Sequence, residues 1–366
     1  MIKILVVFGT RPEAIKMCPV VKELKSRREF HTVVAVTGQH RQMLAQVLAA
    51  FSVEPDYDLA IMSDGQTLFD ITKKALDGVA AVIDEESPDC VLVHGDTTTA
   101  FAASLAAFYK GVPVGHVEAG LRTYNLRSPF PEEYNRQAID ISADYLFAPT
   151  ETSRANLLSE GKPDSRIYVT GNTAIDALKT TVRDNFSHKI TDWAADSRLI
   201  LLTAHRRENL GDTMRSMFRA IRRAVDEHPD VKLVYPVHLN PLVAAAAQDL
   251  QGHDRIMLTE PLDAPDFHNI IARSYLVLTD SGGIQEEAPS LGKPVLVLRD
   301  TTERPEGVEA GTLLLAGTDE RNVYEQLCRL LTDTALYEKM SRAVNPYGDG
   351  FASRRIADIL AGIEPK

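Results

Sequence analysis

Two tripeptides, HGD at 94–96 and HVE at 116–118, place carboxylates beside imidazoles at a spacing that suits acid–base chemistry. Each follows a short run of β-branched residues, and residues 97–109 between the runs are typical of a helix. The strands of such a strand–helix–strand unit are parallel, so Asp96 and Glu118 should lie side by side at one edge of a sheet. Open α/β sheets bind ligands at that edge. The sequence therefore predicts paired acid–base groups there.

The same two carboxylates also have a purely structural interpretation. Asp96 could cap the following helix, because aspartate is a favoured N-cap residue, and Glu118 could pair with Arg122. Helix caps are common, whereas paired acids at a sheet edge are not, so we favour acid–base chemistry for both.

Length and charge limit the class of protein. A chain of 366 residues predicts two domains, and a net charge of −11 argues against a nucleic-acid or anionic-membrane partner. No apolar run approaches the roughly 20 residues of a membrane span, and residues 1–8 predict a buried strand rather than a signal segment. Cys18, Cys90 and Cys328 predict reduced, buried thiols. These features together predict a cytoplasmic enzyme.

Short apolar runs alternate with helical stretches along the whole chain. Strands are predicted at residues 2–8, 32–36, 90–94, 112–117, 145–148, 166–169, 198–203, 232–236, 255–258, 275–279, 294–298 and 312–315. Most runs are continuously apolar, which is typical of parallel strands covered on both faces. The predicted fold class is α/β, with two Rossmann-like, doubly wound parallel-sheet domains. Their boundary is expected within residues 172–196, where the polar stretch 184–196 has little periodicity.

The predicted second domain carries an anion-binding pattern. The sequence DSGGIQEE at 280–287 follows a strand and opens a helix, and its glycines allow backbone N–H groups to approach a ligand. Glu287 could accept both hydroxyls of a ribose, or it could be a surface residue after a tight turn. The loop DTTERPE at 300–306 follows the next strand and reaches the same edge, where Arg304 suits a diphosphate.

Three further clusters are polar at predicted element ends. GTRPEAIK at 9–16 is neither a dinucleotide fingerprint nor a P-loop, but Arg11 and Lys16 make it cationic at a good helix start. Glu132 and Arg136 lie four residues apart on one helix face, which by itself predicts only a surface ion pair of about 0.3 kcal/mol. His205 ends the first strand of the second domain beside arginines, and we favour a functional role for it.

Taken together, these motifs resemble the bacterial non-hydrolysing UDP-N-acetylglucosamine 2-epimerase family. The matching stretches run in order along the chain: FGTRPEAIK (8–16), VHGDTTT (93–99), VGHVEAGLR (114–122), PEEYNR (131–136), TAHRRE (203–208), YPVHLNP (235–241), LTDSGGIQEEAPSLG (278–292), DTTERPE (300–306) and NPYGDG (345–350). As an ordered set they are highly specific.

The resemblance implies a GT-B-like fold with the active site in the interdomain cleft. The domains would span residues 1–172 and 173–345, with residues 346–366 forming a helix that packs back on the first domain, and we expect a homodimer. The implied reaction interconverts UDP-GlcNAc and UDP-ManNAc by eliminating UDP to a 2-acetamidoglucal intermediate and adding it back. It uses no metal or other cofactor and supplies ManNAc for cell-surface polysaccharides.

The resemblance also implies roles for individual residues. The C2 proton of the sugar is not acidic, so two acid–base groups must flank C2 while cations hold the departing diphosphate; Asp96, Glu118 and Glu132 are the candidates. By position, the catalytic residues are Asp96, Glu118, Glu132 and His205, and the substrate-binding residues are Arg11, Lys16, Arg136, Leu262, Phe267, Ser281, Gly282, Gly283, Glu287 and Arg304.

Some members of the family place a second UDP-GlcNAc site beside the active site, where the substrate activates its own conversion. The residues that resemble it here are Gln39, His40, Gln42, Arg206 and His238. Gly65 stands where some members have an arginine, and glycine cannot supply that phosphate contact. We therefore expect an altered effector site, while Gln39 and Gln42 could equally be solvated residues at a helix start.

Three other functions fit parts of the sequence. A hydrolysing relative would release ManNAc and UDP, so stoichiometric accumulation of UDP would reveal it. A glycosyltransferase on the same scaffold would leave Asp96, Glu118 and Glu132 without an obvious task. A catalytically inactive sugar-nucleotide sensor would be expected to lack one of Asp96, Glu118 and His205, and the sequence keeps all three.

Overall fold

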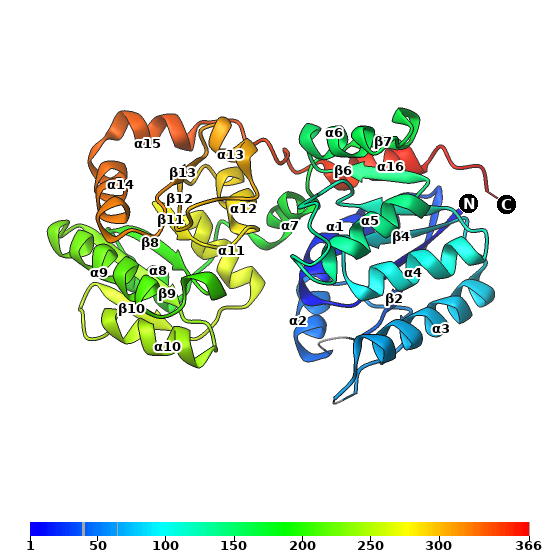
Figure 1. Cartoon of the computed structure of the whole chain (residues 1–366), viewed down its shortest axis with the longest axis horizontal. Coiled ribbons are helices and arrows are strands. Elements are labelled where there is room, and N and C mark those ends of the chain that lie inside the picture. Colours follow the sequence, from blue (N-terminus) through cyan, green and yellow to red (C-terminus); the bar gives the residue numbers. More distant parts are fainter. Residues whose placement is uncertain (39–40, 64, 366) are drawn as a thin grey trace. The chain divides into compact units, whose positions relative to one another are not determined.

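The computed structural model describes residues 1–38, 41–63 and 65–365, and the backbone alone at residues 41–43. It divides into two compact units, Met1–Thr180 with Tyr347–Lys366, and Thr181–Pro346 (Figure 1). The first segment of the first unit ends at Thr180, near the end of the helix Thr173–Thr181, whereas the predicted limit is residue 172. That helix belongs with the first unit because Ala177 packs into its apolar core.

The first unit contains a seven-stranded parallel sheet in the order β3-β2-β1-β4-β5-β6-β7. Its strands are β1 (Ile2–Phe8), β2 (Phe30–Val36), β3 (Tyr57–Asp58), β4 (Cys90–His94), β5 (Val114–Val117), β6 (Tyr145–Ala148) and β7 (Ile167–Val169). Its helices are α1 (Arg11–Ser26), α2 (Arg41–Phe51), α3 (Leu68–Glu86), α4 (Thr98–Tyr109), α5 (Glu132–Ser142), α6 (Glu151–Ser159), α7 (Thr173–Thr181) and α16 (Ala352–Leu360).

Both faces of this sheet are covered, as its continuously apolar strands predict. Ile4 and Val6 face the layer built on α1, α2 and α16, whereas Leu5 and Val7 face the layer built on α3, α4 and α5. Fully burying one such side chain stabilises the fold by about 1.5–3 kcal/mol. The last helix, α16, lies with the first unit (red in Figure 1) because its Ile356 packs into the first of these layers.

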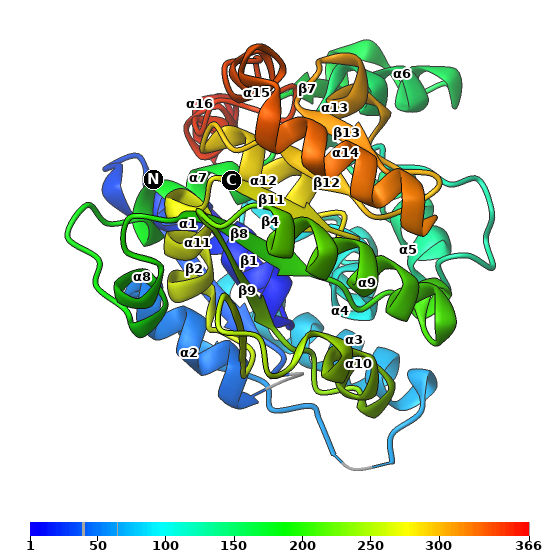
Figure 2. The same ribbon diagram turned by 90° about the vertical axis from the view of Figure 1, so that its left-hand side faces the viewer.

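The second unit repeats the design with a six-stranded parallel sheet in the order β10-β9-β8-β11-β12-β13. Its strands are β8 (Arg198–Thr203), β9 (Val231–Pro236), β10 (Ile256–Thr259), β11 (Leu276–Thr279), β12 (Val295–Val297) and β13 (Leu313–Leu315). Its helices are α8 (Lys189–Ala194), α9 (Asp212–Glu227), α10 (Pro241–Ala247), α11 (Ala264–Arg273), α12 (Ile284–Ser290), α13 (Pro305–Glu309), α14 (Glu320–Thr332) and α15 (Thr334–Ser341). Helices α9 and α14 lie side by side in both views (Figures 1 and 2).

The predicted α/β class with two doubly wound parallel sheets is confirmed, and every predicted strand is present within two residues. The sequence patterns missed two short elements. Strand β3 was missed because two residues are too short to show a periodicity. The polar stretch 184–196 contains the short helix α8, whose Ile190 is buried in the second unit. No helix in the described ranges is long and apolar enough to cross a membrane.

Candidate functional site

Asp96 and Glu118 follow neighbouring strands and lie at the same edge of the first sheet. His94 is in register with Val117, and the Gly95 N–H donates to the Val117 carbonyl at 2.9 Å. The predicted shared edge is therefore confirmed. We call these two side chains the carboxylate edge.

Glu118 contacts a cation from the first helix rather than Arg122. Its carboxylate forms an ion pair with Lys16, and the Asn172 amide donates to it at 3.4 Å. Its backbone has φ +69°, a left-handed conformation that is costly for a residue other than glycine and is concentrated at functional sites. The structural interpretation of Glu118 as the partner of Arg122 is wrong, because Arg122 is directed to Asp140 and Glu160.

His94 lies beside Glu118 as a buried imidazole. Its Nε2 is 3.8 Å from a Glu118 oxygen and has no hydrogen-bond partner within the described residues. Burial lowers the pKa of His94 to about 3. The ring is therefore neutral at physiological pH and contributes no counter-charge to Glu118.

Asp96 is paired with Arg136 from α5, and the Asn135 amide donates to its backbone carbonyl at 2.9 Å. Asp96 does not cap the next helix. That N-cap is Thr97, whose hydroxyl accepts from the Ala100 N–H at 3.0 Å. The capping interpretation is therefore wrong, and the side chain of Asp96 is directed to a cation instead.

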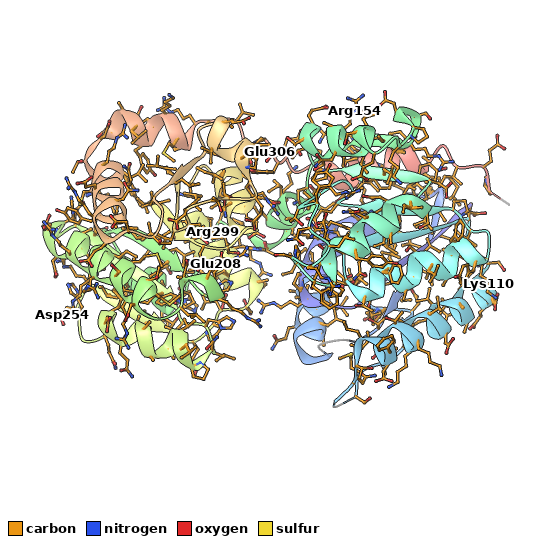
Figure 3. All side chains as sticks on the ribbon, viewed as in Figure 1. Lys110, Arg154, Glu208, Asp254, Arg299 and Glu306 are labelled. Carbon is orange, nitrogen blue, oxygen red and sulfur yellow. The ribbon has the colours of Figure 1, made fainter. Side chains whose placement is uncertain are left out.

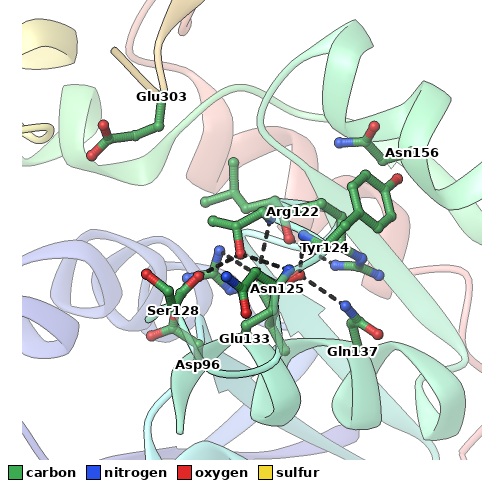
Figure 4. Close-up of polar contacts among 12 residues, drawn as sticks. Asp96, Arg122, Tyr124, Asn125, Ser128, Glu133, Gln137, Asn156 and Glu303 are labelled. Atoms are coloured by element: carbon green, nitrogen blue, oxygen red, sulfur yellow. Dashed lines mark hydrogen bonds and ion pairs between the residues drawn. The ribbon is translucent and has the colours of Figure 1, made fainter. Parts of the chain in front are cut away.

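Glu133, and not Glu132, is the buried carboxylate at the start of α5. It accepts the backbone N–H groups of Thr123 and Tyr124, both at 3.0 Å, and lies 3.3 Å from Arg136 (Figure 4). Glu132 is half-buried at the first position of the helix. The expected surface pair between Glu132 and Arg136 is replaced by the pairs of Arg136 with Asp96 and Glu133. Sequence reasoning missed Glu133 because two adjacent glutamates give no sign of which one points inward.

His116, Asp140 and Arg122, which we call the buried network, support the carboxylate edge with side chains that are closed to solvent. The ring of His116 contacts the Gly95 carbonyl at 2.7 Å and Asp140 at 2.6 Å, and Asp140 binds Arg122 at 2.6 Å. Burial alone would raise the pKa of Asp140, but His116 and Arg122 outweigh it and hold that pKa below its usual range. The buried network connects α5 to the loops that carry Asp96 and Glu118, so it fixes the backbones of these two loops relative to each other.

The first loop of this unit is held by an internal cap. Thr10 is the N-cap of α1, and the carboxylate of Glu13 accepts the N–H groups of Gly9 and Thr10 at 3.0 and 2.7 Å. Burial raises the pKa of Glu13 despite these hydrogen bonds. The loop is fixed by Glu13 while Arg11 and Lys16 remain half-buried at its surface.

In the second unit, Asp280 organises the edge formed by β8 and β11. Its buried carboxylate accepts the backbone N–H groups of His205 and Arg206, both at 2.9 Å. The His205 ring stacks on His238 with centroids 5.3 Å apart. Burial lowers the pKa of His205; the Asp280 carboxylate opposes this effect, and the neighbouring His238 and Arg206 add to it. Asp280 is a second residue whose role sequence reasoning missed.

The predicted nucleotide residues follow β11 and β12 at the same edge. The turn containing Ser281, Gly282 and Gly283 precedes α12, and Arg304 precedes α13 and pairs with the buried Glu286. One Glu287 oxygen is 3.6 Å from His268. Leu262 and Phe267 are partly buried against one apolar cluster of this unit.

Three arginines surround a single carboxylate beside this turn. Glu303 contacts Arg206 at 2.9 Å and also pairs with Arg299, and Arg304 follows it in the chain. Burial would raise the pKa of Glu303, but its own backbone N–H and the three arginines outweigh burial and lower it. We call Arg206, Arg299 and Arg304 the arginine cluster.

Other predicted positions have no defined side-chain geometry. Gln39 and His40 lie outside the described residues, and so does the side chain of Gln42. Gly65 has φ +73° with open space around it. Among the described residues, no cluster of three or more His, Cys, Asp or Glu side chains could hold a metal ion.

A protein-family model described as UDP-N-acetylglucosamine 2-epimerase matches residues 22–361. The chain belongs to this family. The UDP-N-acetylglucosamine 2-epimerase of Bacillus subtilis is 62% identical over 360 residues, covering 98% of this chain and 95% of the relative. The chain is accordingly an enzyme of the isomerase class.

Two solved structures of this family are also similar over almost the whole chain. The S. aureus MnaA–UDP complex has a TM-score of 0.90 and 54% identity, covering 100% of this chain and 99% of that one. The UDP-GlcNAc 2-epimerase from Neisseria meningitidis bound to UDP-GlcNAc has a TM-score of 0.88 and 49% identity, covering 98% and 99%. The GT-B-like α/β fold class is thereby supported from both sequence and structure.

Proposed function

We propose that this enzyme interconverts UDP-GlcNAc and UDP-ManNAc by eliminating UDP across C1 and C2 and adding it back. The observation that carries the proposal is the carboxylate edge, where Asp96 and Glu118 follow adjacent strands and each pairs with a cation. Family membership supports it, since one relative was solved bound to UDP-GlcNAc and another bound to UDP.

The proposed steps balance without an external oxidant. A carboxylate removes the proton from C2, the electrons of the C2–H bond form the C1=C2 double bond, and the C1–O bond breaks so that its electrons leave with UDP. The intermediate is 2-acetamidoglucal. UDP then adds back to C1 while a second acid delivers a proton to the opposite face of C2, which inverts that centre.

The first unit supplies the acid–base groups in this proposal. Asp96, Glu118 and Glu132 are the candidate bases and acids. Lys16 and Arg136 keep the two edge carboxylates oriented through the ion pairs described above, and Arg11 adds a positive charge near a negatively charged substrate.

The second unit supplies the nucleotide-binding groups. The turn with Ser281, Gly282 and Gly283, together with Arg304, would receive the diphosphate, because guanidinium matches phosphate geometry. Glu287 would accept the ribose hydroxyls, Phe267 would contact the nucleotide, and Leu262 would contact the uracil through its backbone. His205 is assigned to the catalytic step as a neutral ring, in keeping with its lowered pKa.

We extend the proposal to the setting of the enzyme. UDP-ManNAc formed in this way would supply ManNAc for cell-surface polysaccharides, and the chain would act as a homodimer in the cytoplasm. A second molecule of UDP-GlcNAc would regulate the enzyme through Gln39, His40, Gln42, Arg206 and His238.

The mechanism is tested by following UDP-GlcNAc in D₂O by NMR, with EDTA present and no NAD added. We expect deuterium at C2 of both UDP-GlcNAc and UDP-ManNAc, because the proton leaves the sugar in every turnover. Retention of the original hydrogen at C2 would indicate hydride transfer and would contradict the elimination. Free UDP accumulating in proportion to consumed substrate would instead identify a hydrolysing enzyme.

A further inference from the structure

The arginine cluster contacts a carboxylate of the protein itself, that of Glu303. Glu303 Oε1 is 2.9 Å from Arg206 Nη2, and the other oxygen of this carboxylate pairs with Arg299. The same carboxylate also lies next to a glycine of the turn, Gly282. A Cβ placed on Gly282 would lie 3.1 Å from Glu303 Oε1, 3.8 Å from Arg206 Nη2 and 3.9 Å from Arg304 Nη2. The carboxylate therefore lies directly over the glycine turn, with two guanidinium groups beside it.

This arrangement has the composition of an anion site that already holds an anion. A carboxylate and a phosphate oxygen make the same charge-assisted hydrogen bonds to guanidinium groups. A side chain at position 282 would crowd the Glu303 oxygen, which could then no longer lie as close to the turn. The surrounding carboxylates have other tasks, because Asp280 caps backbone N–H groups and Glu286 is buried against Arg304.

We infer that Glu303 occupies the position of a phosphate group and that a bound nucleotide diphosphate must displace it. This inference rests on the proposed function, because that function brings a diphosphate to the Gly282 turn. Glu303, an acidic residue next to Arg304, thus acts as an internal competitor of the substrate for the anion site.

Glu303 and Arg206 are exposed enough for a ligand to replace the Glu303 carboxylate. The side chains of Glu303 and Arg206 are 36% and 34% exposed, whereas that of Glu286 is 4% exposed. A half-exposed ion pair contributes little to stability, so releasing Glu303 into solvent costs little. While no ligand is bound, Glu303 offsets the repulsion among the three arginines.

Calorimetric titration of the full-length protein tests the inference with two ligands, UDP and inorganic pyrophosphate. Pyrophosphate requires only the anion site, whereas UDP also requires the uridine contacts. We expect Glu303→Gln to bind both about twofold to threefold more tightly than the wild type, because the competing charge is gone and an exposed ion pair is worth no more than that. Glu303→Asp should also bind pyrophosphate more tightly, because its shorter side chain keeps the charge but withdraws it from Gly282.

The chain offers a matched control in Glu208, which lies 3.4 Å from Arg299 Nη2, whereas Glu303 pairs with Nη1 of the same arginine. Glu208 and Arg299 are both labelled in Figure 3. Glu208→Gln changes the net charge by the same amount, and we expect its pyrophosphate affinity to equal that of the wild type.

Two results would overturn the inference. Pyrophosphate affinity that is unchanged or weaker in both Glu303 variants would make Glu303 an organiser of the arginines rather than a competitor. An equal gain in Glu208→Gln would reduce the effect to net charge. Failure of UDP to bind the wild type would instead contradict the proposed function, and the pyrophosphate comparison would still decide the role of Glu303.

Discussion

The carboxylate edge and the arginine cluster both consist of ion pairs between acidic and basic side chains, but the proposed functional member is the acid in one and the base in the other. In the first unit, acidic side chains are the proposed reagents, and Lys16 and Arg136 are their partners. In the second unit, the arginines are the proposed ligand-binding groups, and Glu303 is their partner. Ion pairing by itself therefore does not reveal which member of a pair carries the function.

Burial separates the two regions. The side chains of Asp140 and Arg122 beneath the carboxylate edge are wholly inaccessible to solvent, whereas Glu303 and Arg206 are about one-third exposed. A buried pair cannot be opened without leaving an uncompensated charge, but an exposed one exchanges partners readily. The comparison suggests that rigid support lies under the acid–base groups and exchangeable pairs lie where the nucleotide binds.

The largest effect is expected for the buried network of His116, Asp140 and Arg122. Asp140→Asn leaves the buried guanidinium of Arg122 without the Asp140 charge, and we expect the free energy of unfolding to fall by about 3–5 kcal/mol. Glu303→Gln, its counterpart in the exposed region, should stay within about 0.5 kcal/mol of the wild type. Urea unfolding followed by circular dichroism measures both. Similar losses in the two variants would remove the distinction drawn between the regions.

The next effect concerns the reagents of the carboxylate edge. Asp96→Asn and Glu118→Gln should each lower kcat by about 10²-fold or more, as expected for acid–base groups, with UDP affinity close to that of the wild type. Coupled assays of epimerisation and calorimetric titration with UDP give the two numbers separately. Wild-type turnover in Glu118→Gln would show that its assignment is wrong.

A smaller effect is expected in the arginine cluster, where the affinity for UDP should change rather than kcat. Arg304→Ala removes a charge-assisted hydrogen bond to the diphosphate and should weaken UDP binding by about tenfold. A matched control is Arg219→Ala, an exposed arginine of α9 in the same unit that pairs with Glu320 and should leave UDP affinity unchanged. The result to watch for is a kcat loss in Arg304→Ala at saturating substrate, since that would place Arg304 in the chemical step.

The smallest effect is expected for the effector residues. If UDP-GlcNAc activates its own conversion, the reaction of pure UDP-ManNAc should begin with a lag, about fivefold below the final rate, that a trace of UDP-GlcNAc removes. The lag should be lost in Gln42→Ala and in His238→Ala. Full initial velocity from pure UDP-ManNAc would exclude an obligatory activator.

Much of the architecture could be predicted from local sequence patterns. Continuously apolar runs gave the parallel strands, because a strand covered on both faces needs no polar alternation. Parallel order then placed Asp96 beside Glu118, and His205 near Ser281 and Arg304, since all carboxyl ends of such a sheet share one edge. Segments too short for a period, namely β3 and α8, were missed.

The choice of partners was decided by tertiary structure alone. Arg122 binds Asp140 rather than Glu118, Glu133 rather than Glu132 points inward, and Glu303 lies over Gly282. Each depends on the direction of a side chain and on segments far apart in the sequence. The sequence by itself determined which residues reach the edges of the two sheets, because strand order and polarity are properties of the backbone. Only the packed side chains determined which charges meet there, because that depends on distances that no local pattern encodes.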